Sequence, residues 1–368
     1  MVRELVEAGY TVRACVRDTS NADKTEHVVA LNDQGFSGSV ELWQADLNDA
    51  GSYDAPFAGC AGVVHTGAVI SSAAGTVDEA TGEVRGRKYS PQEVYTGCFT
   101  EVKHLLESVK KGGATRCVFT SSCAAVLHPQ ESGNYEPGYV FTEDDWCLDH
   151  NPAYQAIQDK LDANDGVAEE LQDPANGSTA YCLAKASTEK YIYAEAEAHG
   201  GFDCVSIMPM HVIGPCMAAN HDMAGTWQNC MRGMMEGKNH PKGWGPSGQM
   251  AWNLVDVRDT AQLHRLCLEH PGVGNGSRYI SAATDSSGLM ATHELQAMLA
   301  EQFPQLDVAG EEKNEDGGYP ETPSIMETYS TLAIESLGLA THSIEETVRA
   351  TGEAYLELGL IGSGIAKL

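Results

Sequence analysis

Residues 115–122 read Thr-Arg-Cys-Val-Phe-Thr-Ser-Ser, and residues 181–185 read Tyr-Cys-Leu-Ala-Lys. The first stretch is a short, largely apolar run that ends in two serines, as is typical of a strand. The second begins a helical pattern that ends at Gly200-Gly201. Side chains four residues apart lie on one face of a helix. The two stretches therefore predict a strand that ends in hydroxyl groups and a helix that presents a phenol beside an amine.

The same alternation of strands and helices covers most of the chain. Further strands are predicted at residues 11–17, 39–45, 62–66 and 203–209, with a short one at Tyr279-Ile280. Further helices are predicted at residues 1–8, 91–111 and 260–270. Strands that alternate with helices predict βαβ units and a parallel sheet that is covered on both faces. The predicted fold class is therefore α/β, with a doubly wound parallel sheet.

The composition excludes several classes of protein. The 368 residues include 52 acidic and 23 basic ones, which give a formal net charge of −29. Such a chain repels phosphate backbones and anionic lipid surfaces, so we expect neither nucleic-acid nor membrane-surface binding. The 11 cysteines form no Cys-x-x-Cys pair, which excludes a disulfide framework and a zinc ribbon. The sequence has neither a run of about 18 apolar residues nor a His-Glu-x-x-His motif. We therefore expect no membrane span, no metal site and a cytoplasmic protein.

Ser122, Tyr181 and Lys185 carry the most specific chemistry in the sequence. Ligands of open α/β sheets bind at the carboxyl ends of the strands, where Ser122 is expected to lie. An ammonium group beside a phenol favours the phenolate, so Lys185 is predicted to lower the pKa of Tyr181. A tyrosine tuned in this way can give a proton to a carbonyl oxygen, and the Ser122 hydroxyl can hold the same oxygen. An ordinary packed tyrosine–lysine pair is the alternative interpretation.

In their order and spacing, these and other motifs resemble the extended short-chain dehydrogenase/reductase superfamily, in particular its dihydroflavonol reductase and cinnamoyl-CoA reductase branch. The resemblance covers nearly the whole chain. It implies a Rossmann-like dinucleotide-binding domain, NADP as cofactor, and hydride transfer to or from a small carbonyl or alcohol substrate. It rests on Ala8–Asp18, Ala45–Leu47, Gly62–His65, Val118–Ser122, Tyr181–Lys185 with Glu189, Pro209 with Gly214-Pro215, and Val255–Ala261.

The resemblance also implies a role for each matching position. Ser122 matches the catalytic serine, Tyr181 the general acid, and Lys185 the lysine that tunes this tyrosine and binds the nicotinamide ribose. Arg17, assisted by Lys24, falls where NADP-preferring relatives bind the adenosine 2′-phosphate, and a cation suits that phosphate. A monomer or a homodimer is expected. The remaining positions that the resemblance places against the cofactor are Asp46, Leu47, Thr66, Gly67, Pro209 and Val212.

Two domains are predicted. Residues 1–215 form the dinucleotide-binding domain, with an acidic insertion at about 143–175. Residues 216–250 and 286–368 form a smaller, mostly helical substrate lobe, and residues 251–285 return to the first domain. The methionines of the substrate lobe have two interpretations, namely an adaptable apolar pocket and ordinary helix packing.

One motif of the superfamily, Thr-Gly-x-x-Gly-x-x-Gly, is absent from the sequence. In this fold the motif follows the first strand and holds the cofactor's pyrophosphate at a helix N-terminus. The first strand lies in the middle of the order 3-2-1-4-5-6, so we expect the sheet to have lost its first strand and to have a gap in its core. Two interpretations are open: a natural start roughly 20 residues upstream of Met1, where this fold has its first strand and glycine-rich turn, or a cofactor-free relative with another role.

The substrate-side residues depart from those of the plant enzymes. The cinnamoyl-CoA reductase signature Asn-Trp-Tyr-Cys-Tyr-Gly-Lys reads Thr-Ala-Tyr-Cys-Leu-Ala-Lys at residues 179–185, so neither a flavonoid nor a cinnamoyl-CoA substrate is supported. A nucleotide-sugar epimerase or dehydratase and a hydroxysteroid-type dehydrogenase are alternatives on the same fold. A sugar-diphosphate pocket needs cationic groups, whereas Arg232 is the only arginine of residues 216–250. A non-catalytic binding protein is the alternative from a different class.

Overall fold

The computed structural model divides the chain into two compact units, which are described separately. The first unit comprises Met1–His128, Glu143–Met208 and Ala261–Tyr279, and the second comprises Pro129–Thr142, Pro209–Thr260 and Ile280–Leu368. The α/β fold class is confirmed, and the domain boundaries predicted from the sequence stay predictions. The structure describes residues 1–67, 76–77, 84–85, 89–127, 139–149, 151–221, 227–238, 251–310, 313, 315–319 and 330–362.

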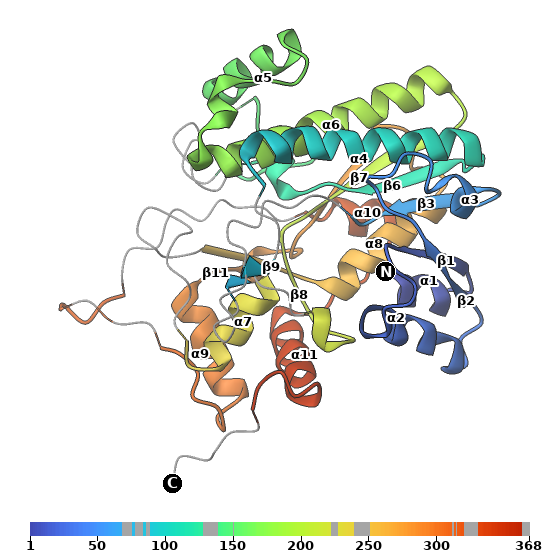
Figure 1. The fold of residues 1–368 in the computed structure, drawn as a ribbon. Helices are drawn as coiled ribbons and strands as arrows, with labels where there is room; N and C mark the ends of the chain where they lie inside the picture. Colours follow the sequence, from blue (N-terminus) through green and yellow to red (C-terminus); the bar gives the residue numbers. More distant parts are fainter. Residues whose placement is uncertain are drawn as a thin grey trace. The chain divides into compact units, whose positions relative to one another are not determined.

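The first unit contains two separate pieces of sheet. One is the parallel pair of β1 (Thr11–Val16) and β2 (Ser39–Gln44). The other has the order β10-β7-β6-β3, in which β3, β6 and β7 run parallel. Figure 1 shows these strands among the helices of the unit. The bounds of the second piece are Gly62–His65 for β3, Arg116–Thr120 for β6, Asp203–Pro209 for β7 and Arg278–Ser281 for β10.

Two long helices, α4 (Pro91–Gly112) and α6 (Gly177–His199), lie side by side against one face of the larger sheet (Figure 1). Ser90 begins α4 with a reciprocal capping box to Glu93, and Gly113 ends it in the left-handed conformation. Apolar residues of α4, α6, β3, β6 and β7 then share one buried cluster, which includes Val63, Val102, Leu105, Cys117, Phe119, Ile192 and Cys204.

Helix α8 (Val257–Glu269) covers the opposite face of β3. Successive residues of a strand point to opposite faces. Val63 packs into the cluster with α4, whereas a Cβ at the neighbouring Gly62 would come within 2.8 Å of Leu268 on α8. A larger residue at position 62 would therefore push the Leu268 side chain of α8 away from β3.

The smaller piece of sheet has its own core. Val6 of α1 (Val2–Glu7) packs with Ala14, Leu31 and Val40. Three further helices of the first unit complete the structure around the two pieces of sheet. They are α2 (Ala22–Val29), α3 (Asp54–Phe57) and α5 (Pro152–Ala163), the last of which lies in the acidic insertion.

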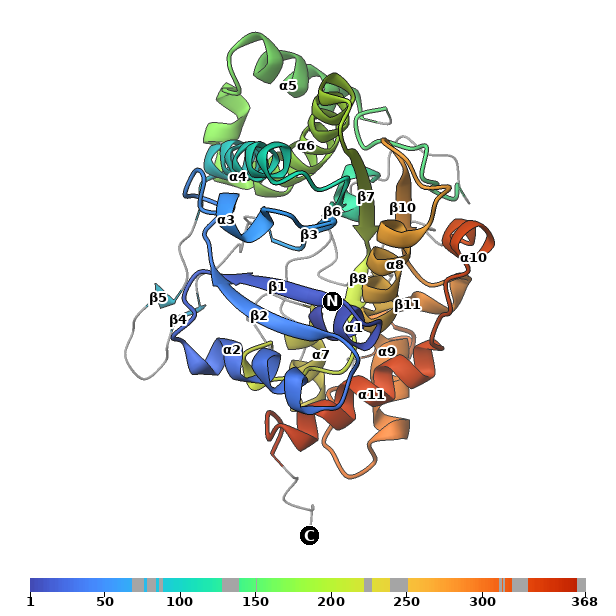
Figure 2. The same ribbon diagram turned by 90° about the vertical axis from the view of Figure 1, so that its right-hand side faces the viewer.

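A gap separates β1 from β3, as the sequence predicts. Among the described residues, β1 pairs only with β2 and β3 pairs only with β6. Figure 2 shows β1 and β2 running together, apart from the ribbon of β3. A cavity of about 910 Å³ lies between the two strands and is lined by every residue of both. The core of the sheet is therefore open where the fold normally has its first strand.

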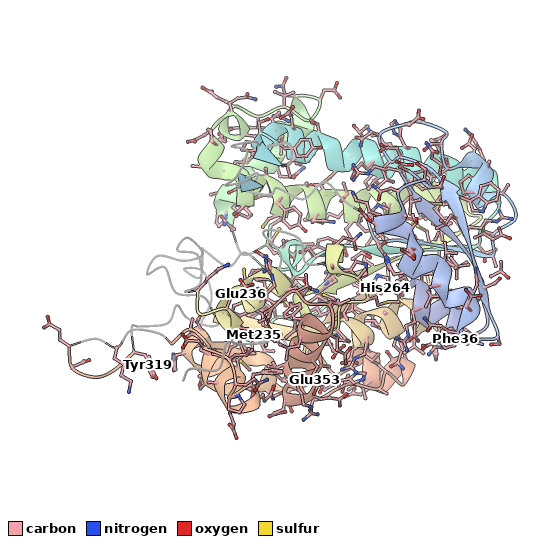
Figure 3. All side chains as sticks on the ribbon, turned by 60° about the horizontal axis from the view of Figure 1, so that its bottom comes forward. Phe36, Met235, Glu236, His264, Tyr319 and Glu353 are labelled. Atoms are coloured by element: carbon pink, nitrogen blue, oxygen red, sulfur yellow. The ribbon has the colours of Figure 1, made fainter. Side chains whose placement is uncertain are left out.

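The second unit contains a three-stranded sheet that the sequence did not predict. Its order is β11-β9-β8, with β8 and β9 parallel and β9 and β11 antiparallel. Met231, Met234 and Met235 are buried in the core beside Trp252, which favours ordinary packing for these methionines (Met235 is labelled in Figure 3). The elements are β8 (His211–Ile213), α7 (Trp227–Met235), β9 (Ala251–Asp256), β11 (Leu289–Ala291), α9 (Thr292–Gln302), α10 (Leu332–Leu337) and α11 (Ile344–Glu357).

A short antiparallel pair of strands is formed by β4 (Thr76–Val77) and β5 (Val84–Arg85). Within the described ranges, no helix combines the length and the apolar character that crossing a membrane requires.

His65, the last residue of β3, is the least expected member of the core. Only 5% of its surface is exposed, and its ring stacks on Phe119 with the centroids 4.8 Å apart. Neither ring nitrogen has a hydrogen-bond partner among the described residues. Burial, helped by the positive charge of Lys185, lowers the pKa of His65 to about 3. The imidazole is therefore neutral in the folded protein at pH values where it is protonated in the unfolded chain.

We predict that His65 makes the protein sensitive to acid. The unfolded chain binds a proton at this position between about pH 6.5 and pH 3 and the folded chain does not, so stability falls as the pH falls. Between pH 7 and pH 5 the loss from this residue is about 2 kcal/mol. The variant His65→Phe should lose correspondingly less unfolding free energy over this range, measured by urea denaturation at both pH values. An equal pH dependence in the variant and the wild type would contradict the prediction, and His199→Phe, at an exposed position, is the control.

Candidate functional site

The two serines that follow β6 have different environments. The hydroxyl of Ser121 is buried and donates a hydrogen bond of 2.7 Å to Oε2 of Glu189. Ser122 is half-buried, and its oxygen accepts a hydrogen bond of 3.2 Å from the backbone N–H of Ala124. The Ser122 side chain also lies near enough to Tyr181 to lower the pKa of its phenol in part. The structure thus brings Ser122, rather than Ser121, to the predicted acid.

Tyr181 and Lys185 lie one turn apart on α6, as predicted. The Nζ atom of Lys185 is 5.7 Å from the centre of the Tyr181 ring and 5.5 Å from that of Phe119. It donates a hydrogen bond of 3.3 Å to the carbonyl oxygen of Thr120, the last residue of β6. The Thr120 hydroxyl is in turn 2.7 Å from Nε2 of His264, which lies on α8 (Figure 3). The end of β6 therefore carries a hydroxyl, a phenol and an amine together.

The electrostatics of this group differ from the sequence prediction. Burial raises the pKa of Tyr181, and the nearby Ser122 side chain opposes this shift only in part. Burial also lowers the pKa of Lys185, which is only 3% exposed. The predicted lowering of the Tyr181 pKa by Lys185 was therefore wrong for the protein on its own, because burial raises this pKa instead. The phenol keeps its proton at neutral pH and can act as a proton donor.

A buried ion pair between Glu189 and Arg278 lies next to the group of Ser122, Tyr181 and Lys185. Glu189 is fully buried and lies one helical turn beyond Lys185. Its carboxylate accepts hydrogen bonds from Ser121, from the Tyr193 hydroxyl at 3.0 Å and from Nε of Arg278 at 2.6 Å. Because a buried carboxylate needs charge and hydrogen-bond partners, these contacts fix the start of the Ser121-Ser122 turn relative to α6.

Arg278 extends this support into the acidic insertion. Its guanidinium lies 3.6 Å from the centre of the Trp146 ring and donates hydrogen bonds to the carbonyl oxygens of Glu143 and Asp145. One arginine of β10 thus holds together the sheet, α6 and the first residues of the insertion. The sequence analysis quoted Glu189 within a motif but missed this role. A charged residue on the buried face of a helix, four positions after Lys185, was the available signal.

The predicted cofactor residues of the first unit follow the carboxyl ends of three strands. Arg17 follows β1, Asp46 and Leu47 follow β2, and Thr66 and Gly67 follow β3. A Cβ placed on Gly67 would come within 2.8 Å of the Leu47 side chain, so the residues that follow β2 and β3 lie close together. The carboxylate of Asp46 accepts hydrogen bonds from Asn48 and closes a turn.

Two basic residues occupy the same edge. Arg17 and Lys24, which lies in the first turn of α2, are both exposed. Neither makes an ion pair with a residue that the structure describes. Their charges are available to an anion from solution.

Pro209 and Val212 belong to the second unit. Pro209 ends β7, and Val212 lies in β8, where it pairs with Val255 of β9. Their predicted contact with the nicotinamide stays a prediction.

The second unit also contains a cluster of Asp256, Asp259 and His342 that could supply three ligand atoms within 4.8 Å of one another. These groups already bind protein partners. Asp256 accepts from Arg258 and Thr347 at 2.7 and 2.8 Å, and Asp259 is 2.5 Å from Nδ1 of His342. The cluster therefore joins the start of α8 to the segment before α11, and its geometry is explained without a bound ion.

The chain is similar to several known proteins. Residues 159–282 match the model of the NAD dependent epimerase/dehydratase family. The chain is 27% identical over 310 residues to a dihydroflavonol 4-reductase from Hordeum vulgare, which covers 84% of the chain and 72% of the relative. It is 28% identical over 340 residues to cinnamoyl-CoA reductase 1 from Oryza sativa subsp. japonica, which covers 92% of the chain and 81% of the relative.

Among solved structures, the yeast methylglyoxal/isovaleraldehyde reductase Gre2 complexed with NADPH matches 96% of the chain and 94% of its own length. The TM-score is 0.69 and the sequence identity 20%, so this likeness concerns the fold. The chain is thus similar in sequence to dihydroflavonol and cinnamoyl-CoA reductases, which confirms the resemblance predicted from the sequence.

We predict that removing the charge of Glu189 strongly destabilises the fold. The variant Glu189→Gln leaves the Arg278 guanidinium buried without its anion, which should cost about 3–5 kcal/mol of unfolding free energy. Glu195→Gln on the same helix is the matched control, because its ion pair with Lys110 is partly exposed and should contribute at most about 1 kcal/mol. Urea denaturation of both variants tests this difference. Equal losses of unfolding free energy would show that the buried pair stabilises the fold no more than the exposed one.

Proposed function

We propose that the protein is an NADP(H)-dependent oxidoreductase that reduces an aldehyde or ketone, or oxidises the corresponding alcohol, with Ser122, Tyr181 and Lys185 as its catalytic group. The observation that carries this proposal is the meeting of these three side chains at the carboxyl end of β6. Ligands of open α/β sheets bind at this edge. The homology to proteins named as reductases supports the same reaction class.

Each side chain has a distinct task in this proposal. The pKa of Tyr181 is raised by burial, so its phenol holds a proton at neutral pH and donates it to the carbonyl oxygen during reduction. The Ser122 hydroxyl donates a hydrogen bond to the same oxygen and orients it. The Lys185 amine donates a hydrogen bond to the Thr120 carbonyl oxygen and would also hold a ribose hydroxyl of the cofactor. The bound nicotinamide supplies or accepts the hydride at the carbonyl carbon.

The described residues fit three parts of this cofactor. Arg17 is an exposed cation with no ion-pair partner among the described residues, and it stands at the end of β1, where a 2′-phosphate is expected. Asp46 and Leu47 follow the neighbouring strand, β2, and suit the adenosine. Lys185 suits the nicotinamide ribose at the end of β6. The glycine-rich turn that holds a pyrophosphate in this fold is not among the residues of the sequence.

The variant Tyr181→Phe should separate binding from catalysis. It removes the proton donor, so turnover of a panel of aldehydes and ketones should fall at least about 100-fold. It removes no contact to the cofactor's phosphates. The dissociation constant for NADPH, measured by titration against protein fluorescence, should change little. Unchanged turnover would exclude Tyr181 as the acid, and no NADPH binding at millimolar concentration would overturn the proposed function.

Arg17→Ala should weaken NADPH binding selectively. A charge-assisted hydrogen bond to a phosphate contributes about 1.5–3 kcal/mol, so the dissociation constant for NADPH should rise roughly tenfold or more. NADH has no 2′-phosphate and should bind nearly as before. Arg3→Ala is the matched control, because Arg3 is an exposed arginine of the same unit that pairs with Glu7. Equal losses for NADPH and NADH would place Arg17 away from the 2′-phosphate.

A further inference from the structure

Helix α4 carries a row of polar side chains that hold the segment between β2 and β3. His104, Ser108 and Lys111 lie at positions i, i+4 and i+7, so this polar row shares one face of the helix. The Ser108 hydroxyl donates a hydrogen bond of 2.7 Å to Oδ1 of Asp54, and Nζ of Lys111 donates one of 2.8 Å to Oδ2 of the same carboxylate. These two contacts attach the first residue of α3 to α4 (Figure 2).

The end of α4 also lies directly against the end of α3. A Cβ placed on Gly112 would come within 2.7 Å of the Phe57 carbonyl oxygen. The Gly112 carbonyl oxygen accepts a hydrogen bond of 3.0 Å from the backbone N–H of Gly59. Because these contacts involve the backbone, which cannot move aside as a flexible side chain can, α3 has a fixed place on α4.

His104 makes the remaining contact of the polar row, at the other end of the segment. Its Nδ1 atom lies 2.8 Å from the carbonyl oxygen of Leu47. A carbonyl oxygen can only accept a hydrogen bond, so Nδ1 of this half-buried imidazole carries the hydrogen. The Leu47 side chain packs against the buried cluster that α4 shares with α6, β3, β6 and β7. Both the backbone and the side chain of Leu47 are therefore held in place.

The turn that contains Leu47 owes its shape to other contacts. The Asp46 carboxylate accepts hydrogen bonds from Asn48. The Ser52 hydroxyl accepts from the backbone N–H of Asp46 at 3.2 Å and donates to its carbonyl oxygen at 2.7 Å. These bonds lie within the turn and do not fix its place on the protein. Among the residues that the structure describes, the bond from His104 is the hydrogen bond that ties this turn to α4.

The place of this turn affects the proposed cofactor site. Asp46 and Leu47 stand on its adenosine side, whereas Lys185 stands on its nicotinamide side and belongs to α6, which lies beside α4. A ligand that contacts both sides binds more tightly when both are already in place, because binding then orders fewer groups. His104 supplies this order on the adenosine side through the backbone of Leu47.

We propose that His104 is a positioning residue of the cofactor site, whose imidazole holds the Leu47 turn in the place where the adenosine of NADP(H) contacts it. This inference rests on the proposed function and adds a residue that touches neither the cofactor nor the reacting atoms. Loss of the His104 hydrogen bond should weaken the binding of the adenosine part. It should leave the chemical step unchanged once the enzyme is saturated with cofactor.

The test compares His104→Leu, which removes the donor, with His104→Asn, whose amide places a donor close to the position of Nδ1. Isothermal titration calorimetry gives the dissociation constants for NADPH and for adenosine 2′,5′-bisphosphate, which lacks the nicotinamide. His104→Leu should raise both constants roughly fivefold, as expected for the loss of one ordinary hydrogen bond. His104→Asn should restore most of the affinity, and the turnover number at saturating NADPH should stay within about twofold of the wild type in both variants.

Thr100→Leu is the matched control. Thr100 lies one turn before His104 at an exposed position, and its hydroxyl donates to the Thr96 carbonyl oxygen within the helix. Its substitution should leave both dissociation constants unchanged. Wild-type affinity in His104→Leu would overturn this inference alone, and so would a loss of turnover without a loss of affinity. No binding of either ligand by the wild type would overturn the proposed function together with the inference.

If His104→Leu fails to fold, the wild-type chain still decides. Its histidines are followed by nitrogen NMR at about pH 8, where an ordinary imidazole is neutral, and the His104 signals are those missing in His104→Asn. They should show the hydrogen on Nδ1, and they should move when adenosine 2′,5′-bisphosphate is added. A hydrogen on Nε2, or signals that the bound ligand leaves in place, would contradict the inference.

Discussion

The fully buried carboxylate of Glu189 is the constraint on which the candidate site depends. A charge removed from water is tolerated only with an opposite charge and with hydrogen bonds to its remaining lone pairs. Arg278 supplies the charge, and Ser121 and Tyr193 supply further donors. Because Ser122 follows Ser121 and Lys185 lies one turn from Glu189, the arrangement that satisfies the carboxylate also positions both. Satisfying one buried charge thus places two of the proposed catalytic side chains.

The gap in the sheet divides the proposed cofactor site of the first unit into two halves. Ser122 and Lys185 belong to the larger piece, whose strands pair continuously from β3 to β10. Arg17 and Asp46 follow the strands of the smaller piece, which holds its own core around Val6 and Leu31. Among the described residues no backbone ladder connects the pieces.

Most of the features that could be predicted from the sequence depend on patterns among residues that are close together along the chain. The strands of the first unit alternate or run apolar, and α4 and α6 end at glycines in the left-handed conformation, so their bounds followed from local pattern. The sheet of the second unit includes two strands of only three residues, which are too short to show a period. Arg278 and Glu189 are 89 residues apart, and no local rule pairs them. The direction of the Tyr181 pKa depends on burial, which only the packed structure determines.

The net charge of −29 and an anionic cofactor are compatible for a physical reason. At physiological ionic strength, charges farther apart than about 8 Å are largely screened, so the affinity for a phosphate depends on its immediate neighbours. Many basic residues of the chain pair with acids, such as Lys110 with Glu195 and Arg265 with Glu4. Arg17 after β1 and Lys24 in the first turn of α2 are exposed and make no ion pair with any described residue. A strongly acidic surface with a locally cationic edge repels extended polyanions but still admits a small phosphorylated ligand.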